Sequence, residues 1–192
     1  MKKYIYIKSD EFKFIYFITP KAGSRTIVKY LKNLGFEFKG DKMRSFDFEK
    51  YKDYFKFGFT RNPWDRMVSV WKNKVIDGHE TGVDNLRIFK DFKVFLKKAC
   101  EKNLECCDNH IKLQTVMLPC EHLDYIGDLY SLNKDFKIIC DKLGIKLQPI
   151  PHENKSQHKH YTEYYDDETR EIVAQKYARD IEYFGYKFGG EQ

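Results

Sequence analysis

The chain has 192 residues, enough for one well-cored domain and few for two, since domains usually span about 100–200 residues. It is 42% hydrophobic and 33% charged with only 11 Gly and 5 Pro, which excludes collagen-like, low-complexity and mostly disordered classes. Residues 1–96 carry 21 Lys and Arg against 12 Asp and Glu, while residues 97–192 carry 14 against 17. We therefore expect an anionic ligand to meet the N-terminal half.

The location of the protein is inferred from its apolar runs and its cysteines. No apolar run approaches the roughly 18 residues of a membrane-spanning helix, and Asp10 and Glu11 interrupt the start before a signal peptide could form. The five cysteines are an odd number, whereas disulfide frameworks normally have an even one. We expect a cytoplasmic protein with no membrane segment.

The first elements along the chain are predicted to be two strands and a helix. Tyr4–Lys8 alternates between apolar and polar residues, and the denser run Lys13–Ile18 is typical of a strand buried on both faces. The turn Thr19–Thr26 follows, and apolar residues then recur at helical spacing from Ile27 to Leu34. The segment therefore indicates strand, tight turn and helix.

The same pattern returns about forty residues later. Tyr54–Thr60 is predicted to be a strand, Arg61 and Asn62 a turn, and Pro63–Val75 a helix with Asn62 as its cap. Two successive strand–turn–helix segments imply parallel strands joined by right-handed crossovers. We predict an α/β fold, a parallel β-sheet flanked by helices, in a single domain over residues 1–192.

The other elements are predicted from periodicity and end signals. In chain order they are a short helix over Phe46–Tyr51, a loop over Ile76–Asp84, a helix over Leu86–Lys102, a strand over Asp124–Leu129, a helix from Ser131 to Leu143 ended by Gly144, a loop over Ile145–His160 and a last helix over Asp166–Phe184.

The first turn has the composition of an anion-binding site. A strand that enters a helix through a glycine-containing turn leaves backbone N–H groups unpaired at the positive end of the helix, where phosphate or sulfate binds. Gly23 permits close approach, Ser24 and Thr26 offer hydroxyls, and Lys21 adds a charge. The alternative interpretation is a capped helix with a surface lysine. The nucleotide-binding pattern GxxxxGK[ST] is absent, so Mg-dependent kinase chemistry is not supported.

The second turn strengthens this interpretation. Arg61 lies at the carboxyl end of a predicted strand, where ligands of open α/β sheets bind, and Ser69 lies eight positions later, with Arg66 between them. Arg61 offers a bidentate grip on phosphate and Ser69 a hydroxyl. Two anion-binding turns on neighbouring parallel strands indicate a ligand with two separate phosphate-type groups.

Both turns resemble a known family. PKAGSRT and FTRNPWDRMVSVW are similar to the 5′-phosphosulfate loop and the 3′-phosphate motif of sulfotransferases that use 3′-phosphoadenosine 5′-phosphosulfate (PAPS), closest to the carbohydrate-type sulfotransferase family 2. Ala22 departs from the threonine that is common there, and the family's usual membrane anchor is missing, which favours a bacterial or viral relative. The resemblance covers roughly residues 13–188 and continues through His110-x-x-x-Gln114, Asp124–Gly127, Asp135-Phe136, Pro151–Ser156 and Asp180–Phe188.

The resemblance implies metal-free transfer of a sulfuryl group from PAPS to a hydroxyl or amine, with a carbohydrate as the expected acceptor. It implies that Lys21 neutralises the leaving oxygen and that Arg61 and Ser69 hold the 3′-phosphate. It also places a loop containing Asn154, Lys155 and Ser156 over the nucleotide. The residues implied at the 5′ end are Lys21, Ala22, Gly23, Ser24, Arg25 and Thr26.

The catalytic base is predicted less directly. An acceptor hydroxyl must lose its proton, which requires a His or a carboxylate with a pKa near the working pH. His110 in the His-x-x-x-Gln element is the first choice, and a histidine hydrogen-bonded within a loop is the alternative. A zinc site at Cys106-Cys107-x-x-His110 with Cys120-x-His122 is disfavoured, because adjacent cysteines are poor tetrahedral partners.

Two other function classes compete with a sulfotransferase. The 14 Tyr and 16 Phe suggest base-stacking surfaces and a polyanion or single-stranded nucleic-acid binder, but these aromatics recur at core periodicities. A P-loop-type nucleotide kinase is weakened by the missing GK[ST]. We therefore expect PAPS and a saccharide as partners and no nucleic acid, with the segments Ile76–Leu86 and 145–160 as walls of the acceptor pocket.

Overall fold

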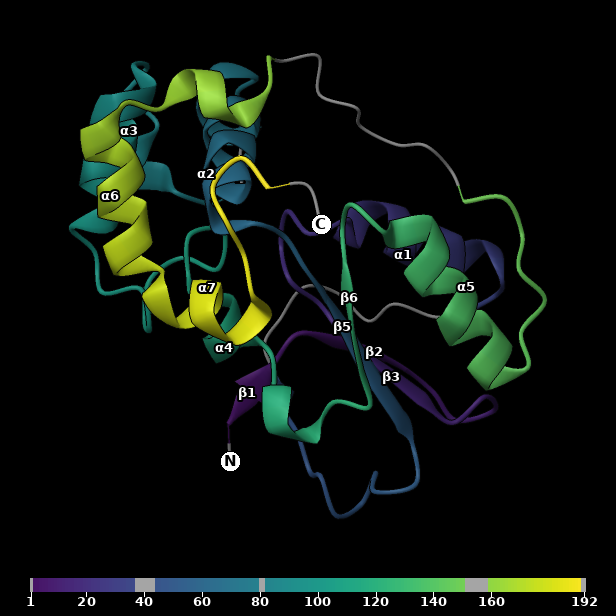
Figure 1. Ribbon diagram of the computed structural model, residues 1–192. Coiled ribbons are helices and arrows are strands. Elements are labelled where there is room, and N and C mark those ends of the chain that lie inside the picture. Colours follow the sequence, from purple (N-terminus) through teal and green to yellow (C-terminus); the bar gives the residue numbers. More distant parts are fainter. Residues whose placement is uncertain (1, 37–43, 80–81, 151–158, 191–192) are drawn as a thin grey trace. The chain divides into compact units, whose positions relative to one another are not determined.

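A computed structural model describes residues 2–36, 44–79, 82–150 and 159–190 (Figure 1). The chain divides into two compact units. The first unit comprises Met1–Thr60 and Met117–Lys155, and the second comprises Arg61–Val116 and Ser156–Gln192. The expectation of a single domain remains a prediction.

The first unit is built on a four-stranded sheet. Its strands are β2 (Tyr6–Ser9), β3 (Phe14–Phe17), β5 (Phe55–Thr60) and β6 (Tyr125–Asp128), in the order β2-β3-β5-β6. Strands β3, β5 and β6 are parallel, which confirms the predicted fold class, and β2 runs antiparallel to β3. Only four residues separate β2 from β3, too few for the crossover that a parallel pair needs.

A two-stranded sheet and three helical segments complete this unit. The antiparallel strands β1 (Lys3–Tyr4) and β4 (Arg44–Ser45) form the small sheet. Helices α1 (Ser24–Asn33) and α5 (Leu132–Leu143) follow β3 and β6, and a 3₁₀ turn covers Cys120–His122. Gly144 ends α5 in the left-handed conformation, as predicted.

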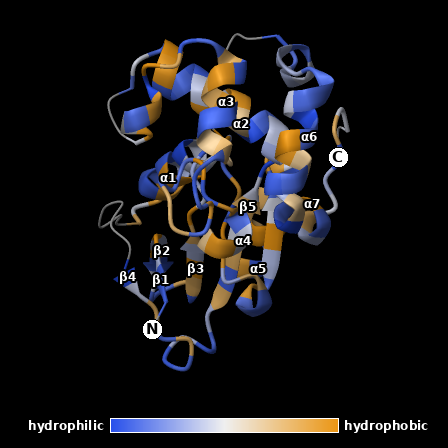
Figure 2. Ribbon diagram, turned by 90° about the vertical axis from the view of Figure 1, so that its left-hand side faces the viewer, coloured by the Kyte–Doolittle hydropathy of each residue, from blue (hydrophilic) through white to orange (hydrophobic). Residues whose placement is uncertain are grey.

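Helices α1 and α5 pack side by side on one face of the sheet (Figure 1). Tyr30 of α1 and Phe136 of α5 meet edge to face with ring centroids 4.8 Å apart. Alternate strand residues point toward these helices, since side chains on a strand alternate between its faces, and Tyr16 stacks on Phe57 there at 5.1 Å. Figure 2 shows the hydrophobic residues along β3.

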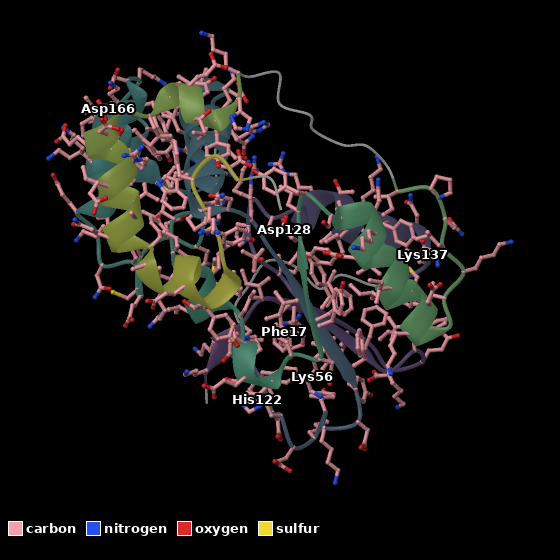
Figure 3. The ribbon with its side chains drawn as sticks, in the orientation of Figure 1. Phe17, Lys56, His122, Asp128, Lys137 and Asp166 are labelled. Carbon is pink, nitrogen blue, oxygen red and sulfur yellow. The ribbon has the colours of Figure 1, made fainter. Side chains whose placement is uncertain are left out.

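The opposite face of β3 is covered by aromatic side chains. Phe17, labelled in Figure 3, lies 5.4 Å from the ring of Tyr4 and 5.0 Å from that of Phe46. The predicted helix over Phe46–Tyr51 is wrong: residues 48–53 form successive turns with i→i+3 bonds, such as Lys52 N–H to Glu49 O at 3.3 Å. The aromatic spacing there serves this cluster and not a helical face.

The second unit is helical. Its long helices are α2 (Pro63–Trp71), α3 (Phe92–Cys100), α6 (Asp167–Lys176) and α7 (Ala178–Phe184). Helix α2 continues as a π-helix over Lys72–Ile76, whose i→i+5 bond joins Asp77 N–H to Lys72 O at 2.8 Å. Short 3₁₀ turns cover Asp84–Leu86 and Tyr161–Tyr164, and α4 (Gln114–Met117) lies where the chain returns to the first unit.

Two helix predictions in this unit need correction. The last helix is two helices, because the backbone departs from helical geometry at Tyr177, whose ring is fully buried and whose hydroxyl donates to Ile111 O at 2.6 Å. The predicted helix Leu86–Lys102 begins later, at Phe92, where the Asp91 side chain accepts the Val94 N–H at 3.0 Å. Figure 3 labels Asp166, which caps α6 in the same way.

Candidate active site

The turn after β3 holds two residues in the left-handed conformation. Ala22 N–H donates to Thr19 O at 3.3 Å, which closes the turn. Lys21 has φ 71° and Gly23 has φ 75°. For a residue with a Cβ this conformation costs roughly 1–2 kcal/mol, and such strain is concentrated at functional sites. Lys21 is therefore held in a backbone conformation that glycine would adopt at lower cost.

The start of α1 presents backbone donors. Its first intrahelical bond runs from Ile27 N–H to Gly23 O at 3.1 Å, so the amides of Ser24, Arg25 and Thr26 precede the hydrogen-bonded ladder. The N-cap is Gly23, which has no side chain to accept them, and this fully described first turn contains no acidic residue. The positive end of the helix and its amides therefore suit an anion.

The predicted residues of this turn differ in exposure. Ala22 is fully buried in the core of the first unit, so only its backbone can take part in binding. Arg25 is exposed, Thr26 is buried, and Lys21 and Ser24 are half-buried. A Cβ on Gly23 would lie 3.1 Å from Leu129 Cδ1, so the turn packs tightly on the segment after β6. Figure 3 labels Asp128, the last residue of that strand.

Arg61 begins the second unit, and its backbone is held on both sides by one amide side chain. Arg61 N–H donates to Gln114 Oε1 at 3.0 Å, and Gln114 Nε2 donates to Arg61 O at 2.9 Å. The fully buried carboxylate of Asp180 accepts the N–H groups of Gln114 at 2.8 Å and Thr115 at 3.0 Å, and the Thr115 hydroxyl at 2.8 Å. This network fixes the turn that carries Arg61.

The Arg61 guanidinium is oriented by a bidentate ion pair. Its Nε and Nη2 atoms each lie 2.8 Å from the carboxylate of Asp65, one helical turn later. Both side chains are largely buried, with 12% and 6% exposed. Sequence reasoning missed Asp65, although its i,i+4 spacing from Arg61 is a signal for such a pair. A guanidinium carries five N–H donors, and this pair uses two of them and orients the group.

Ser69 and Arg66 lie further along α2 and are both buried. Arg66 donates from Nη1 to Lys112 O at 2.7 Å and from Nη2 to Asn109 O at 2.9 Å. Burial lowers its pKa from the ordinary value. Arg66 therefore fastens the segment 109–112 to α2, and this segment carries His110.

His110 is hydrogen-bonded to Asp108. Its Nδ1 lies 2.8 Å from Asp108 Oδ1, and its backbone N–H donates to the same oxygen at 2.8 Å. Burial lowers the pKa of His110, and the Asp108 carboxylate opposes this effect. Burial would raise the pKa of Asp108, but the hydrogen bonds from His110 outweigh it and bring that pKa to about 2.

The remaining predicted residues have simpler outcomes. Asn154, Lys155 and Ser156 lie outside the described residues.

Within the part of the chain that the structure describes, no group of three His, Cys, Asp or Glu side chains is placed to hold a metal ion. All five cysteines are free thiols. Among the described helices, none has the length and apolar character to cross a membrane.

The parallel strands and the flanking helices define an α/β protein, and the turn before α1 has the backbone geometry that suits an anion. A sequence model of the sulfotransferase family matches residues 4–187. The chain belongs to the sulfotransferase family, and it is a transferase that uses PAPS as the sulfuryl donor. No curated protein and no solved structure gives a significant match.

Proposed function

We propose that this protein transfers the sulfuryl group of PAPS, in line, to a hydroxyl or amine of an acceptor, with a saccharide hydroxyl as the favoured acceptor. The observation that carries the proposal is the turn after β3, where the left-handed Lys21 stands beside the uncapped start of α1. PAPS supplies the activated sulfuryl group. The saccharide acceptor rests on the resemblance to carbohydrate sulfotransferases.

The donor nucleotide has two anionic ends, and each proposed binding segment suits one of them. We assign the 5′ end to Lys21, to the backbone of Ala22 and Gly23, and to the amides and side chains of Ser24, Arg25 and Thr26. Arg61 and Ser69 bind the 3′-phosphate, with Asp65 orienting the guanidinium. The loop that covers the nucleotide is assigned, as the family resemblance implies, to Asn154, Lys155 and Ser156.

The proposed chemistry divides between two residues of the chain. The Lys21 ammonium neutralises the charge that develops on the leaving phosphate oxygen as its bond to sulfur breaks. His110 takes the proton of the acceptor hydroxyl at Nε2 as the acceptor oxygen forms its bond to sulfur. A positioned base contributes typically 10²–10⁴-fold, and the remaining acceleration comes from orientation and charge stabilisation.

The domain organisation and the location of the protein belong to the same proposal. We assign residues 1–192 to one sulfotransferase domain, because the family match spans most of both compact units. The odd number of cysteines supports a cytoplasmic location, since disulfide frameworks normally pair their thiols.

Transfer of ³⁵S from labelled PAPS to a panel of acceptors tests this function. The panel contains a neutral oligosaccharide, a desulfated uronic-acid polysaccharide, a phenol and an aliphatic amine. We expect label in a saccharide, no transfer by Lys21→Ala, and normal transfer by Lys29→Ala, a lysine on the exposed face of α1. Label in the phenol or amine alone would refute the saccharide acceptor, and label in no acceptor would count against transfer.

A further inference from the structure

The Asp108 carboxylate has three donors, all within the second unit. His110 contributes its ring Nδ1 and its backbone N–H, and the backbone N–H of Val83 contributes a third hydrogen bond. Val83 lies in the segment Ile76–Leu86 that the sequence suggests as an acceptor wall. The Asp108 carboxylate therefore accepts hydrogen bonds both from His110 and from the segment Ile76–Leu86.

We propose that Asp108 is a positioning residue that holds His110 in the Nδ1–H tautomer, so that Nε2 keeps the lone pair that accepts the acceptor's proton. The inference rests on the proposed function, in which His110 is the base. Asp108 itself touches no reacting atom in this scheme and acts only through the imidazole.

The tautomer follows from the chemistry of the contact. An ionised carboxylate only accepts hydrogen bonds, so a ring nitrogen 2.8 Å from it must be the donor. Asp108 is ionised at neutral pH, because its pKa is about 2. The lowered pKa of His110 keeps the ring neutral there, which leaves its other nitrogen without a proton.

The backbone that covers this edge of the ring is strained. Gly82 has φ 81° and Val83 has φ 52°, and a positive φ is a genuine outlier for a β-branched residue. A Cβ on Gly82 would lie 2.4 Å from His110 Nδ1 and 2.7 Å from its Cε1. Such strain persists only where the surroundings enforce it. Here the strained backbone places Gly82 and Val83 against Asp108 and against the Nδ1 edge of the His110 ring.

The charges around His110 act in opposite directions on its pKa. Asp108 favours the protonated ring, while Lys74 of the π-helix and Arg66 of α2 disfavour it. Lys74 is 2% exposed and Arg66 1% exposed, so both charges act from inside the unit. Removing the Asp108 charge must therefore lower the pKa of His110 further and move the acid limb of the pH–rate profile to lower pH.

The direct test is ¹⁵N NMR of the His110 imidazole in the full chain, compared with Asp108→Leu. The wild type should show the Nδ1–H tautomer. Leucine has a side chain of similar size that accepts no hydrogen bond, so Nδ1 loses the acceptor that holds its proton and the Nε2–H tautomer should be populated. We expect kcat to fall at least 100-fold, with the Kd for the product nucleotide PAP unchanged and the acid limb shifted downward. The exposed Asp141 of α5, paired with Lys137, provides the control Asp141→Leu, which should change none of these.

A second pair of variants tests the covering wall without altering charge. Gly82→Ala and Gly144→Ala both place a Cβ on a left-handed backbone, but the Cβ at position 144 has nothing within 4 Å among the described residues. Only Gly82→Ala should displace the His110 ring and lower kcat. Equal activity of the two would overturn the role of the wall.

The outcomes separate this inference from the proposed function. An Nε2–H tautomer in the wild type, or an unchanged tautomer in Asp108→Leu, would overturn the role of Asp108 whatever the assay shows. A switched tautomer with full activity would overturn its part in the reaction. A fully active His110→Ala would instead remove the base assignment from the proposed function, and the NMR result would still decide the tautomer.

Discussion

At the scale of single residues, Lys21 combines an unfavourable backbone with the charge that we propose neutralises the leaving oxygen. Glycine at this position would relieve the left-handed strain and remove the ammonium. We predict that Lys21→Gly and Lys21→Ala both lower turnover by orders of magnitude while the affinity for PAP falls only modestly, because PAP lacks the sulfuryl group. The two variants should differ in stability, with Lys21→Gly the more stable.

Steady-state kinetics, calorimetry with PAP and urea unfolding measure these three quantities. A difference of about 1 kcal/mol in the free energy of unfolding between the glycine and alanine variants is expected from the backbone alone. Turnover near that of the wild type in either variant would make Lys21 a bystander.

Arg61 is expected to distinguish a nucleotide that carries a 3′-phosphate from one that lacks it. Arg61→Ala, and more mildly Ser69→Ala, should weaken PAP far more than adenosine 5′-phosphosulfate, which lacks the 3′-phosphate. A charge-assisted hydrogen bond is worth about 1.5–3 kcal/mol, or roughly 10- to 150-fold in Kd. Titration calorimetry with both ligands measures the difference, and equal losses would place Arg61 away from the 3′-phosphate.

The sequence predicts some of these residues and not others, for a physical reason. Lys21, Gly23 and Arg61 stand in two short turns after predicted strands, and the two turns taken together indicate an anion site. Gln114 acts on Arg61 across 53 positions of sequence, and Asp180 acts on Gln114 across 66. No local spacing reveals such pairs, because the fold creates them.

At the scale of elements, the start of α4 depends on one buried carboxylate. Asp180→Ala would leave the N–H groups of Gln114 and Thr115 without their acceptor in a buried place, and each such group costs about 1–3 kcal/mol. We predict a loss of at least 2 kcal/mol in the free energy of unfolding. Weaker PAP binding should accompany it, because Gln114 no longer holds Arg61.

Urea unfolding and PAP calorimetry of Asp180→Ala measure both effects. The matched control is Asp167→Ala in α6, whose side chain is 95% exposed and whose substitution should stay within about 0.5 kcal/mol. Unchanged stability of Asp180→Ala would show that α4 is held by other contacts.

The sequence predicts those elements whose hydrophobic residues follow a single strand or helix period throughout. The dense apolar run of β3 and the helical spacing of α1 and α5 are confirmed. The final helix was predicted as one element because its spacing continues through Tyr177, and only the tertiary burial of that ring breaks it. The aromatic residues 46–51 serve a cluster on the sheet, and their local spacing imitates a helix.

At the scale of the whole molecule, nucleotide binding should raise stability in a selective way. PAP at one hundred times its Kd should stabilise the fold by about 2.7 kcal/mol. ATP with Mg²⁺ and a single-stranded oligonucleotide should give much smaller shifts, since ATP has no 3′-phosphate and the internal phosphates of an oligonucleotide are diesters with one negative charge each. Differential scanning fluorimetry at matched ionic strength measures the shifts, and a larger shift with either competitor would contradict the assignment of the turns.

The π-helix at Lys72–Ile76 has a consequence for how relatives of this chain should be compared. Its i→i+5 turn holds one residue more than an α-helical turn, and each residue of an α-helix advances the phase by about 100°. A relative with a one-residue deletion here would have a regular helix and would turn a different side chain toward the position of Lys74. Its histidine would then lack the Lys74 charge and would titrate at a higher pH. A single gap in an alignment would thus mark a change in the acidity of the proposed base.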